Sequence, residues 1–135
     1  GAHTVRMEAA SSTVQLTSNG GFTNDGTIEM TSSNAGAYTY LQLTSGTLTN
    51  SVTGLLNFQA DQGDRYLDAH LDNYGTVQVN HNTYFNKGSG LYRNYGQFNV
   101  AGGVTLNFQG GGTFDQEGET FDLNGERLTI GMEDV

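Results

Sequence analysis

The chain contains no cysteine, no proline and no tryptophan among its 135 residues. Without cysteine it can form no disulfide framework, no thiolate zinc site and no thiol nucleophile. The three histidines, His3, His70 and His81, have no metal-ligand spacing with one another, so an imidazole zinc site is not predicted either. The fold must therefore be held together by its core and its hydrogen bonds.

Positive charge is also scarce. Five Lys and Arg residues stand against 14 Asp and Glu residues, which gives a formal net charge of −9. Binding to nucleic acid or to an anionic lipid surface needs a cationic footprint, so the sequence predicts neither partner. No basic start precedes an apolar run, and no apolar stretch reaches membrane-spanning length, so membrane insertion is not predicted.

The length predicts one domain with one core over residues 1–135. We interpret Gly1-Ala2-His3 as a cloning remnant, which implies that the chain can be a fragment of a larger protein. Glycine or asparagine interrupts almost every ten-residue window, and apolar residues alternate instead of recurring at helical spacing. This pattern predicts short β-strands.

One nine-residue pattern recurs along the chain. Residues 22–30, 71–79 and 92–100 share a large apolar residue, an Asn, a Gly, and then two apolar residues with a polar one between them. A copy at residues 48–58 fits with two residues inserted between Asn and Gly, and a fifth at 114–118 replaces Asn with Gln. The motif glycines, at positions 26, 54, 75, 96 and 118, are 28, 21, 21 and 22 residues apart.

A near-constant step of this size is the length of one coil of a parallel β-solenoid, in which each coil lays its strands on those of the coil before. The predicted fold is all-β: a single-stranded parallel β-helix of about five coils, with 21–28 residues per coil. The repeats cover residues 22–118, and residues 119–135 are predicted to form a terminal coil or cap. The longer first step predicts a bulge or outward loop near residues 32–37.

Stacked coils turn equivalent motif positions into columns. Two apolar columns flank a polar one, as a pleated strand with one buried face requires. The apolar columns are Ile28, Leu56, Val77, Phe98 and Met30, Phe58, Val79, Val100, and the polar column is Glu29, Asn57, Gln78, Asn99. A fourth column holds Asn24, Asn50, Asn73, Asn94 and Gln116. These amides are predicted to hydrogen-bond along the stack as a structural ladder, and ligand binding by them is the alternative.

Two tyrosines are candidates for a ligand-binding surface. Tyr74 and Tyr95 occupy the same motif position, between Asn and Gly, in adjacent coils. They are therefore predicted to stand side by side on an outward corner, where paired rings can stack against sugars, with Tyr84 and Tyr92 extending the surface. The alternative is that solvated tyrosines merely cover the turn.

Four aspartates crowd one region of the sequence, at Asp61, Asp64, Asp68 and Asp72. The segment Asp61-Gln62-Gly63-Asp64 is loosely similar to an oxygen-rich calcium loop, so Ca²⁺ is the one cofactor that the sequence suggests. Calcium takes roughly six to eight oxygen ligands, and the spacing fits neither an EF-hand nor a Gly-rich calcium repeat. A solvated acidic face is the alternative.

No catalytic motif stands out. Carboxylates can supply the acid and base of a glycosidase, but a sequence does not reveal a pair at the required separation. Solenoid enzymes that cleave acidic polysaccharides need cations to hold the substrate, and the five Lys and Arg residues are spread singly along the chain. There is no Gly-x-Ser-x-Gly nucleophile motif. We therefore expect a non-catalytic protein, with a polysaccharide lyase or hydrolase as the third hypothesis.

The units Phe/Leu-x-Asn-x-Gly-Thr-Ile/Val-x-Met/Val, together with residues 41–50, resemble the repeat regions of large bacterial secreted and surface proteins, such as autotransporter passengers and filamentous-haemagglutinin-like adhesins. The similarity covers residues 22–118. It implies export to the cell surface or the extracellular space, right-handed winding and a longer parent chain. The acidic stretch 115–122 and the out-of-register last coil depart from the pattern, which suggests a terminal cap or a domain end.

The function that this resemblance implies is a structural or adhesive repeat module. The implied partners are flanking repeats of the same chain and a polysaccharide or host cell-surface glycan. Edge-to-edge self-association is a further expectation, because open strand edges of a solenoid recruit other chains. A carbohydrate-binding module that uses the tyrosines is the second hypothesis.

Overall fold

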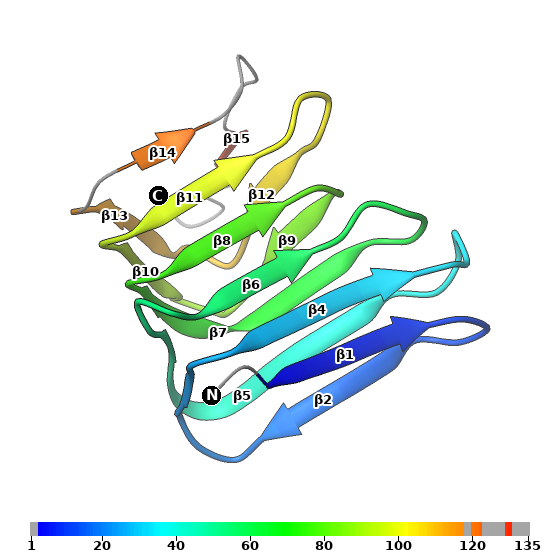
Figure 1. The fold of residues 1–135 in the computed structure, drawn as a ribbon, viewed down its shortest axis with the longest axis horizontal. Helices are drawn as coiled ribbons and strands as arrows, with labels where there is room; N and C mark the ends of the chain where they lie inside the picture. Colours follow the sequence, from blue (N-terminus) through cyan, green and yellow to red (C-terminus); the bar gives the residue numbers. More distant parts are fainter. Residues whose placement is uncertain (1–2, 118–119, 123–128, 131–135) are drawn as a thin grey trace.

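The computed structural model of the chain describes residues 3–117, 120–122 and 129–130, and every strand pairing among them is parallel (Figure 1). The strands wind into a β-solenoid of about five coils, as the repeats predict. In this part of the chain no helix has the length and apolar character needed to cross a membrane.

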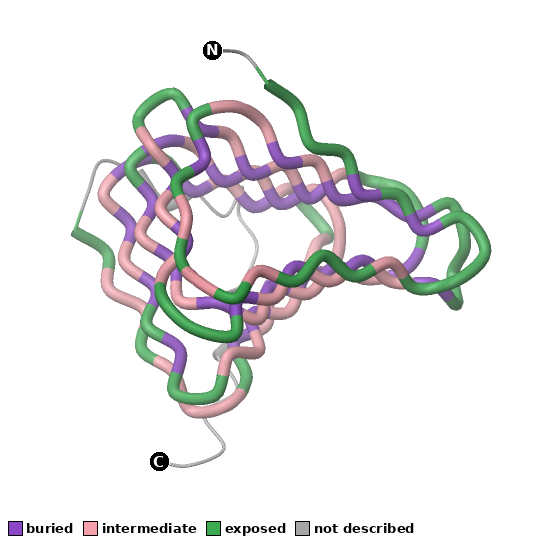
Figure 2. The backbone as a smooth tube through the Cα atoms, turned by 90° about the horizontal axis from the view of Figure 1, so that it is seen from below, coloured by how far each residue is buried: buried purple, intermediate pink, exposed green. Residues whose placement is uncertain are grey.

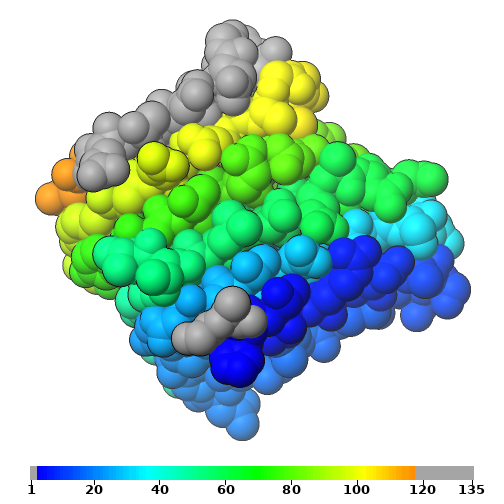
Figure 3. All heavy atoms as spheres, in the orientation of Figure 1, coloured from blue at the N-terminus to red at the C-terminus, as the bar shows by residue number. Residues whose placement is uncertain are grey.

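Each coil contributes one strand to a six-stranded sheet and one long or two short strands to a nine-stranded sheet. The first sheet contains β1 (Thr4–Ala9), β4 (Thr27–Ser32), β6 (Leu55–Phe58), β8 (Thr76–Val79), β11 (Gln97–Val100) and β14 (Thr120–Asp122). The second contains β2 (Val14–Ser18), β3 (Phe22–Asn24), β5 (Thr39–Asn50), β7 (Arg65–Asn73), β9 (Thr83–Phe85), β10 (Leu91–Asn94), β12 (Leu106–Phe108), β13 (Thr113–Gln116) and β15 (Thr129–Ile130). In Figure 3 successive coils form adjacent bands across the surface.

Strand register gives the coil lengths directly. Thr4 lies opposite Thr27, and the same column continues through Leu55, Thr76, Gln97 and Thr120. The steps are therefore 23, 28, 21, 21 and 23 residues. The predicted terminal coil or cap is described only in part: β14 and β15 pair with β11 and β12, and residues 118–119, 123–128 and 131–135 lie outside the described residues.

The 28-residue coil differs from the next, 21-residue coil at three places. The loop between Ser32 and Thr39 holds two extra residues, as predicted for this segment, and the turn after Asn50 holds two more. The largest insertion, three residues, lies inside β5, where the register shifts between Gln42 and Thr47. Lys87, which lies two coils further on, donates its Nζ to the Leu43 carbonyl at this bulge, over 3.1 Å.

The two predicted apolar columns form the core. Ile28, Leu56, Val77 and Phe98 lie opposite one another, as do the four residues of the second column, and each is at most 3% exposed. Burying this apolar surface stabilises the fold by about 25 cal/mol per Å² and selects the register, because a slip by one residue would bury Glu29. In Figure 2 buried segments alternate with half-buried ones along the strands of the stacked coils.

The motif glycines serve close packing between coils. Gly26, Gly54, Gly75 and Gly96 are not among the glycines with positive φ, so of the two roles open to them the approach of backbones is the one observed. A Cβ on Gly75 would overlap the carbonyl oxygens of Ser51 and Gly54. The small residue therefore lets one turn rest on the turn below.

Replacing Gly75 by alanine is expected to lower the free energy of unfolding by about 1–3 kcal/mol, because the added methyl group meets fixed backbone atoms. Gly88 is the matched control: no atom lies within 4 Å of the place that an added Cβ would take, and its φ is not positive. Gly88→Ala should change the free energy by no more than about 0.5 kcal/mol. Urea unfolding of both variants measures the difference, and equal effects would rule out this role of Gly75.

Candidate functional site

The amide column forms a hydrogen-bonded ladder along the stack. The Nδ2 groups of Asn24, Asn50 and Asn73 donate to the Oδ1 atom of the next Asn over 2.8, 2.8 and 2.7 Å, and Asn94 donates to Gln116 Oε1 over 2.8 Å. Each of the four Asn side chains also donates to the carbonyl of the motif glycine in its own turn. Because the Asn residues are at most 8% exposed, this geometry fits the structural role better than ligand binding.

Tyr74 and Tyr95 lie side by side on the outer corner that follows β7 and β10. Their rings stack with centroids 4.7 Å apart and an angle of 6° between the planes. Tyr74 is 44% exposed. A groove of about 220 Å³ runs beside it, lined by Val52, Tyr74, Gly75, Thr76, Gly96 and Gln97. Of the sequence-predicted pair, Tyr74 therefore borders a small concave surface.

Charged side chains lie next to this corner. Arg93 lies in register between Asp72 and Asp115, and its Nε donates to Asp72 Oδ1 over 2.8 Å. Hydrogen bonding to Asp115 raises the pKa of Glu117, and the negative charge of Asp115 acts in the same direction. Arg93 is thus held in an ion pair and is not a free cation for an acidic ligand.

Tyr92 does not extend the corner surface. It is 1% exposed and packs against Phe85 and Phe108 with centroid distances of 5.1 and 5.3 Å. Burial raises its pKa to about 12. Its motif position, in register with Leu71 of the coil before, is an inward one, so the prediction that it adds to an exposed surface was wrong.

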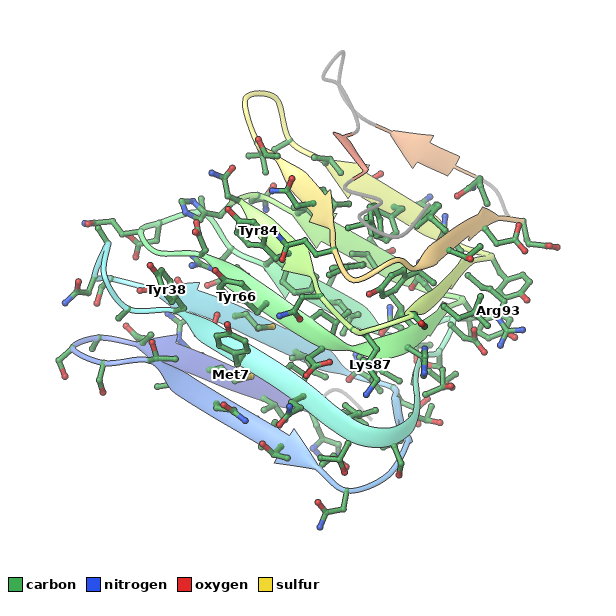
Figure 4. The ribbon with its side chains drawn as sticks, turned by 180° about the vertical axis from the view of Figure 1, so that it is seen from behind. Met7, Tyr38, Tyr66, Tyr84, Lys87 and Arg93 are labelled. Atoms are coloured by element: carbon green, nitrogen blue, oxygen red, sulfur yellow. The ribbon has the colours of Figure 1, made fainter. Side chains whose placement is uncertain are left out.

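Tyr84 is outward but belongs to a different surface from the corner pair. On the sheet of β5, β7 and β9 it stacks on Tyr66, which stacks on Tyr40, with centroids 4.9 and 4.3 Å apart and angles of 15° and 2°. Tyr38 meets Tyr66 edge-on at 5.7 Å. We call Tyr38, Tyr40, Tyr66 and Tyr84 the tyrosine face; Figure 4 shows Tyr38, Tyr66 and Tyr84 projecting from this sheet.

Acidic and amide groups surround the tyrosine face. Gln42 donates to Asp68 over 2.9 Å, and Gln15 donates to Gln42 over 3.0 Å. Burial raises the pKa of Tyr66 to about 12, with smaller contributions from Tyr40 and Asp64. Burial also raises the pKa values of Tyr40 and Tyr84, to which Asp68 and Asp64 respectively add. The ionised groups that act on these phenols are carboxylates, so the face favours a neutral or cationic ligand.

A recurring tripeptide with a central tyrosine marks the tyrosine face in the sequence. Thr39-Tyr40-Leu41, Arg65-Tyr66-Leu67 and Thr83-Tyr84-Phe85 lie in register in three successive coils. The steps between these tyrosines are 26 and 18 residues. The insertions in β5 and after Asn50 lengthen the first step, and the loop from β8 to β9, three residues shorter than that from β6 to β7, shortens the second. A search for one constant step therefore misses them.

Three of the four aspartates predicted as calcium ligands have different neighbours. Asp68 accepts from Gln42 and Asp72 from Arg93, while Asp64 lies 3.9 Å from His81. Among the described residues no three His, Cys, Asp or Glu side chains lie where they could hold one metal ion. The fold spreads these carboxylates, so the observed arrangement matches the acidic-face alternative and not the calcium loop.

Arg65 lies beneath these aspartates and is fully buried. Its guanidinium donates to four backbone carbonyls: Nε to Met30 over 2.9 Å, Nη1 to Gln62 and Gly63 over 2.9 Å each, and Nη2 to Gln59 over 2.8 Å. Burial lowers its pKa, and the charges of Asp61 and Asp64 oppose that shift. Arg65 therefore organises the loop that leads from β6 into β7.

His81 lies 3.9 Å from Asp64, and burial and the Arg65 charge lower its pKa below 6.5. The unfolded chain then binds more protons than the folded chain in the window from 6.5 down to the folded pKa. Stability is expected to fall as the pH drops through that window, and His81→Asn should reduce the loss. Urea midpoints at about pH 7.5 and 5.5 measure it; an unchanged pH dependence would contradict this role.

No protein-family model, curated protein or solved structure matches the chain. The functional argument therefore depends on the surfaces themselves.

Proposed function

We propose that this chain is a non-catalytic structural and adhesive repeat module that binds a neutral glycan through the tyrosine face. The observation that supports the proposal is the concentration of four of the seven tyrosines on one outward surface. Tyrosine gives a large, rigid contact area with a polar tip, and Asn and Gln add adaptable hydrogen bonds. The proposal puts the module outside the cell or on its surface, as the resemblance to adhesin repeats implies.

Ring stacking limits how a sugar can lie on this surface. Both faces of Tyr66 are covered by Tyr40 and Tyr84, so a ligand meets Tyr66 at its edge and its hydroxyl group. Tyr40 and Tyr84 each stack on one ring only, Tyr66, among the described tyrosines. Beyond them the register places Gln15 next to Tyr40 and Asn107 next to Tyr84, so these amides and the solvent-facing edges of the two rings are the proposed contacts for a pyranose ring.

Charge favours an uncharged sugar. Asp64 and Asp68 border the face, and the whole chain carries a formal charge of −9. A polyanionic polysaccharide would be repelled by this field. The corner gives little support for glycan cleavage. The Asp115 carboxyl is close enough to raise the pKa of Glu117 through hydrogen bonding and charge, whereas a glycosidase needs carboxyl groups roughly 5 Å or more apart.

The test is glycan binding by the wild-type chain and two matched variants. Tyr40→Thr/Tyr84→Thr removes the two outer rings of the stack while keeping residues that suit a strand. We expect it to weaken binding at least about tenfold, the effect of losing a contact of about 1.4 kcal/mol. Tyr74→Thr, at the corner, should bind like the wild type, and thermal unfolding checks that both variants are folded.

The corner groove is the second candidate site, because it offers a concavity beside Tyr74. Loss of binding in Tyr74→Thr with normal binding in the double variant would move the site to this corner. If the wild-type chain binds no neutral glycan at all, the adhesive part of the proposal is wrong and a spacer role is left.

A further inference from the structure

The parallel stacking of the Tyr74 and Tyr95 rings at the corner is not needed to pack the turn. Tyr74 and Tyr95 follow the amide ladder in adjacent coils, and their backbone N–H groups donate to Asn50 and Asn73 carbonyls over 2.7 Å each. The two turns are therefore equivalent and their backbones fixed. The rings that project from them are parallel within 6°, with centroids 4.7 Å apart.

Two phenols in this arrangement are placed for oxidative coupling. A phenol that loses one electron and one proton becomes a phenoxyl radical, with much of its unpaired spin on the ring carbons next to the oxygen. Two such radicals join most readily when their rings meet face to face. A stack held in place also has the high effective concentration of an intramolecular reaction.

We propose that Tyr74 and Tyr95 are an oxidative cross-linking site, at which a peroxidase and hydrogen peroxide join adjacent coils through a dityrosine bond. Each phenol gives up one electron and one proton, and the peroxide is reduced to two molecules of water. The radicals form one Cε–Cε bond. Each bonded carbon then loses its proton and each oxygen regains one, so that the product has two hydrogen atoms fewer than the two tyrosines.

The exposure of Tyr74 and the position of both tyrosines in turns outside the strands select this pair over the tyrosine face, and Tyr95 is half-buried. Tyr74 is 44% exposed and lies in a turn, where its side chain can swing from the stacked arrangement into the joined one. Tyr66 is half-buried on a strand, between two rings, so its coupling would require the three-ring stack to open. The Tyr40 and Tyr66 centroids are closer, at 4.3 Å, but the need to open the three-ring stack outweighs this shorter distance.

The dityrosine cross-link would give the chain a covalent bond between its coils. The chain has no cysteine, so no disulfide can join its coils. A bond between residues 74 and 95 closes a loop of one coil, and a cross-link of this kind stabilises a protein mainly by restricting its unfolded chain. The oxidised protein is therefore expected to unfold at a higher temperature than the untreated protein.

The experiment treats the full chain with a haem peroxidase and hydrogen peroxide at low protein concentration. We expect a monomeric product with the mass of the chain less two hydrogen atoms, dityrosine fluorescence, and a linked peptide pair that contains residues 74 and 95. Tyr74→Phe and Tyr95→Phe keep the ring stack but lack the phenol, and each should abolish the link. Tyr66→Phe is the matched control and should form it.

Three results would overturn the proposal: no intramolecular link in the wild-type chain, a link that persists in Tyr74→Phe, or a link that joins tyrosines of the tyrosine face instead. Dimers without an internal link would count as the first of these. The proposal is independent of glycan binding, because Tyr74 and Tyr95 lie outside the tyrosine face. Glycan binding that fails while the link forms would affect only the proposed function.

Discussion

Arg65→Met is expected to lower the free energy of unfolding by about 3–5 kcal/mol, the cost of breaking a buried charged network by removing one partner. The four carbonyls on Met30, Gln59, Gln62 and Gly63 would lose the guanidinium as a donor inside the protein, and of these the Met30 carbonyl would still accept from the Gln59 N–H. An unsatisfied buried polar group costs roughly 1–3 kcal/mol. Methionine fills much of the same volume, so the effect reports hydrogen bonding more than cavity formation.

Arg93→Met is the matched control for this prediction. Arg93 makes a close ion pair with Asp72, but its side chain is 38% exposed. Exposed pairs of this kind contribute little to stability, so the variant should lose far less than Arg65→Met does. Guanidinium chloride unfolding of the two variants gives the comparison. If Arg65→Met costs no more than Arg93→Met, the guanidinium does not organise the loop.

Asn73→Asp is expected to cost about 3–5 kcal/mol near neutral pH, although the side chain keeps its shape. In the wild type Asn73 Nδ2 donates to Asn94 Oδ1, Gly75 O and Gln97 O over 2.7, 3.3 and 3.0 Å. A carboxylate oxygen at this place would face three oxygens and find no proton. Protonation would restore one donor, so the variant should regain stability as the pH falls.

Asn99→Asp controls for the charge of the new carboxylate. Asn99 lies on the outer face of β11, half-buried, and donates to Gln78 over 3.3 Å. The change there should cost no more than about 1 kcal/mol. Urea unfolding of both variants at two pH values tests the ladder, since equal losses at the two positions would show that it adds nothing beyond ordinary packing.

The stacking register could be predicted from the sequence because several columns agree on it. The motif glycine requires a close approach of backbones, the Asn amides pair with the side-chain amides of the next coil, and two apolar positions must face inward. At Gly75, Asn73, Val77 and Val79 these demands select one alignment with the next coil, and the pairing of β8 with β11 follows it. Agreement of local and global preferences is what makes a fold predictable from its sequence.

The surfaces were harder to predict because outward side chains are not constrained by close packing, amide pairing or burial. The calcium hypothesis failed on geometry: residues four apart on a strand, such as Asp68 and Asp72, are separated by about 13 Å. Burial of Arg65 conflicts with the usual exposure of arginine, although it shares its inward alternation with Leu67, Ala69 and Leu71. The tyrosine face escaped notice because an insertion in β5 changed the spacing of its rings.

The most direct test of the stacked coils uses the absence of cysteine. Gln78 and Asn99 lie opposite each other in adjacent coils, whereas Glu29 lies three coils away from Asn99 in the same column. The pair Gln78→Cys/Asn99→Cys should form an intramolecular disulfide under mild oxidation, since paired Cα atoms of neighbouring strands lie within its reach. Glu29→Cys/Asn99→Cys should keep both thiols free; a disulfide in this second pair, with none in the first, would contradict the stacked parallel coils.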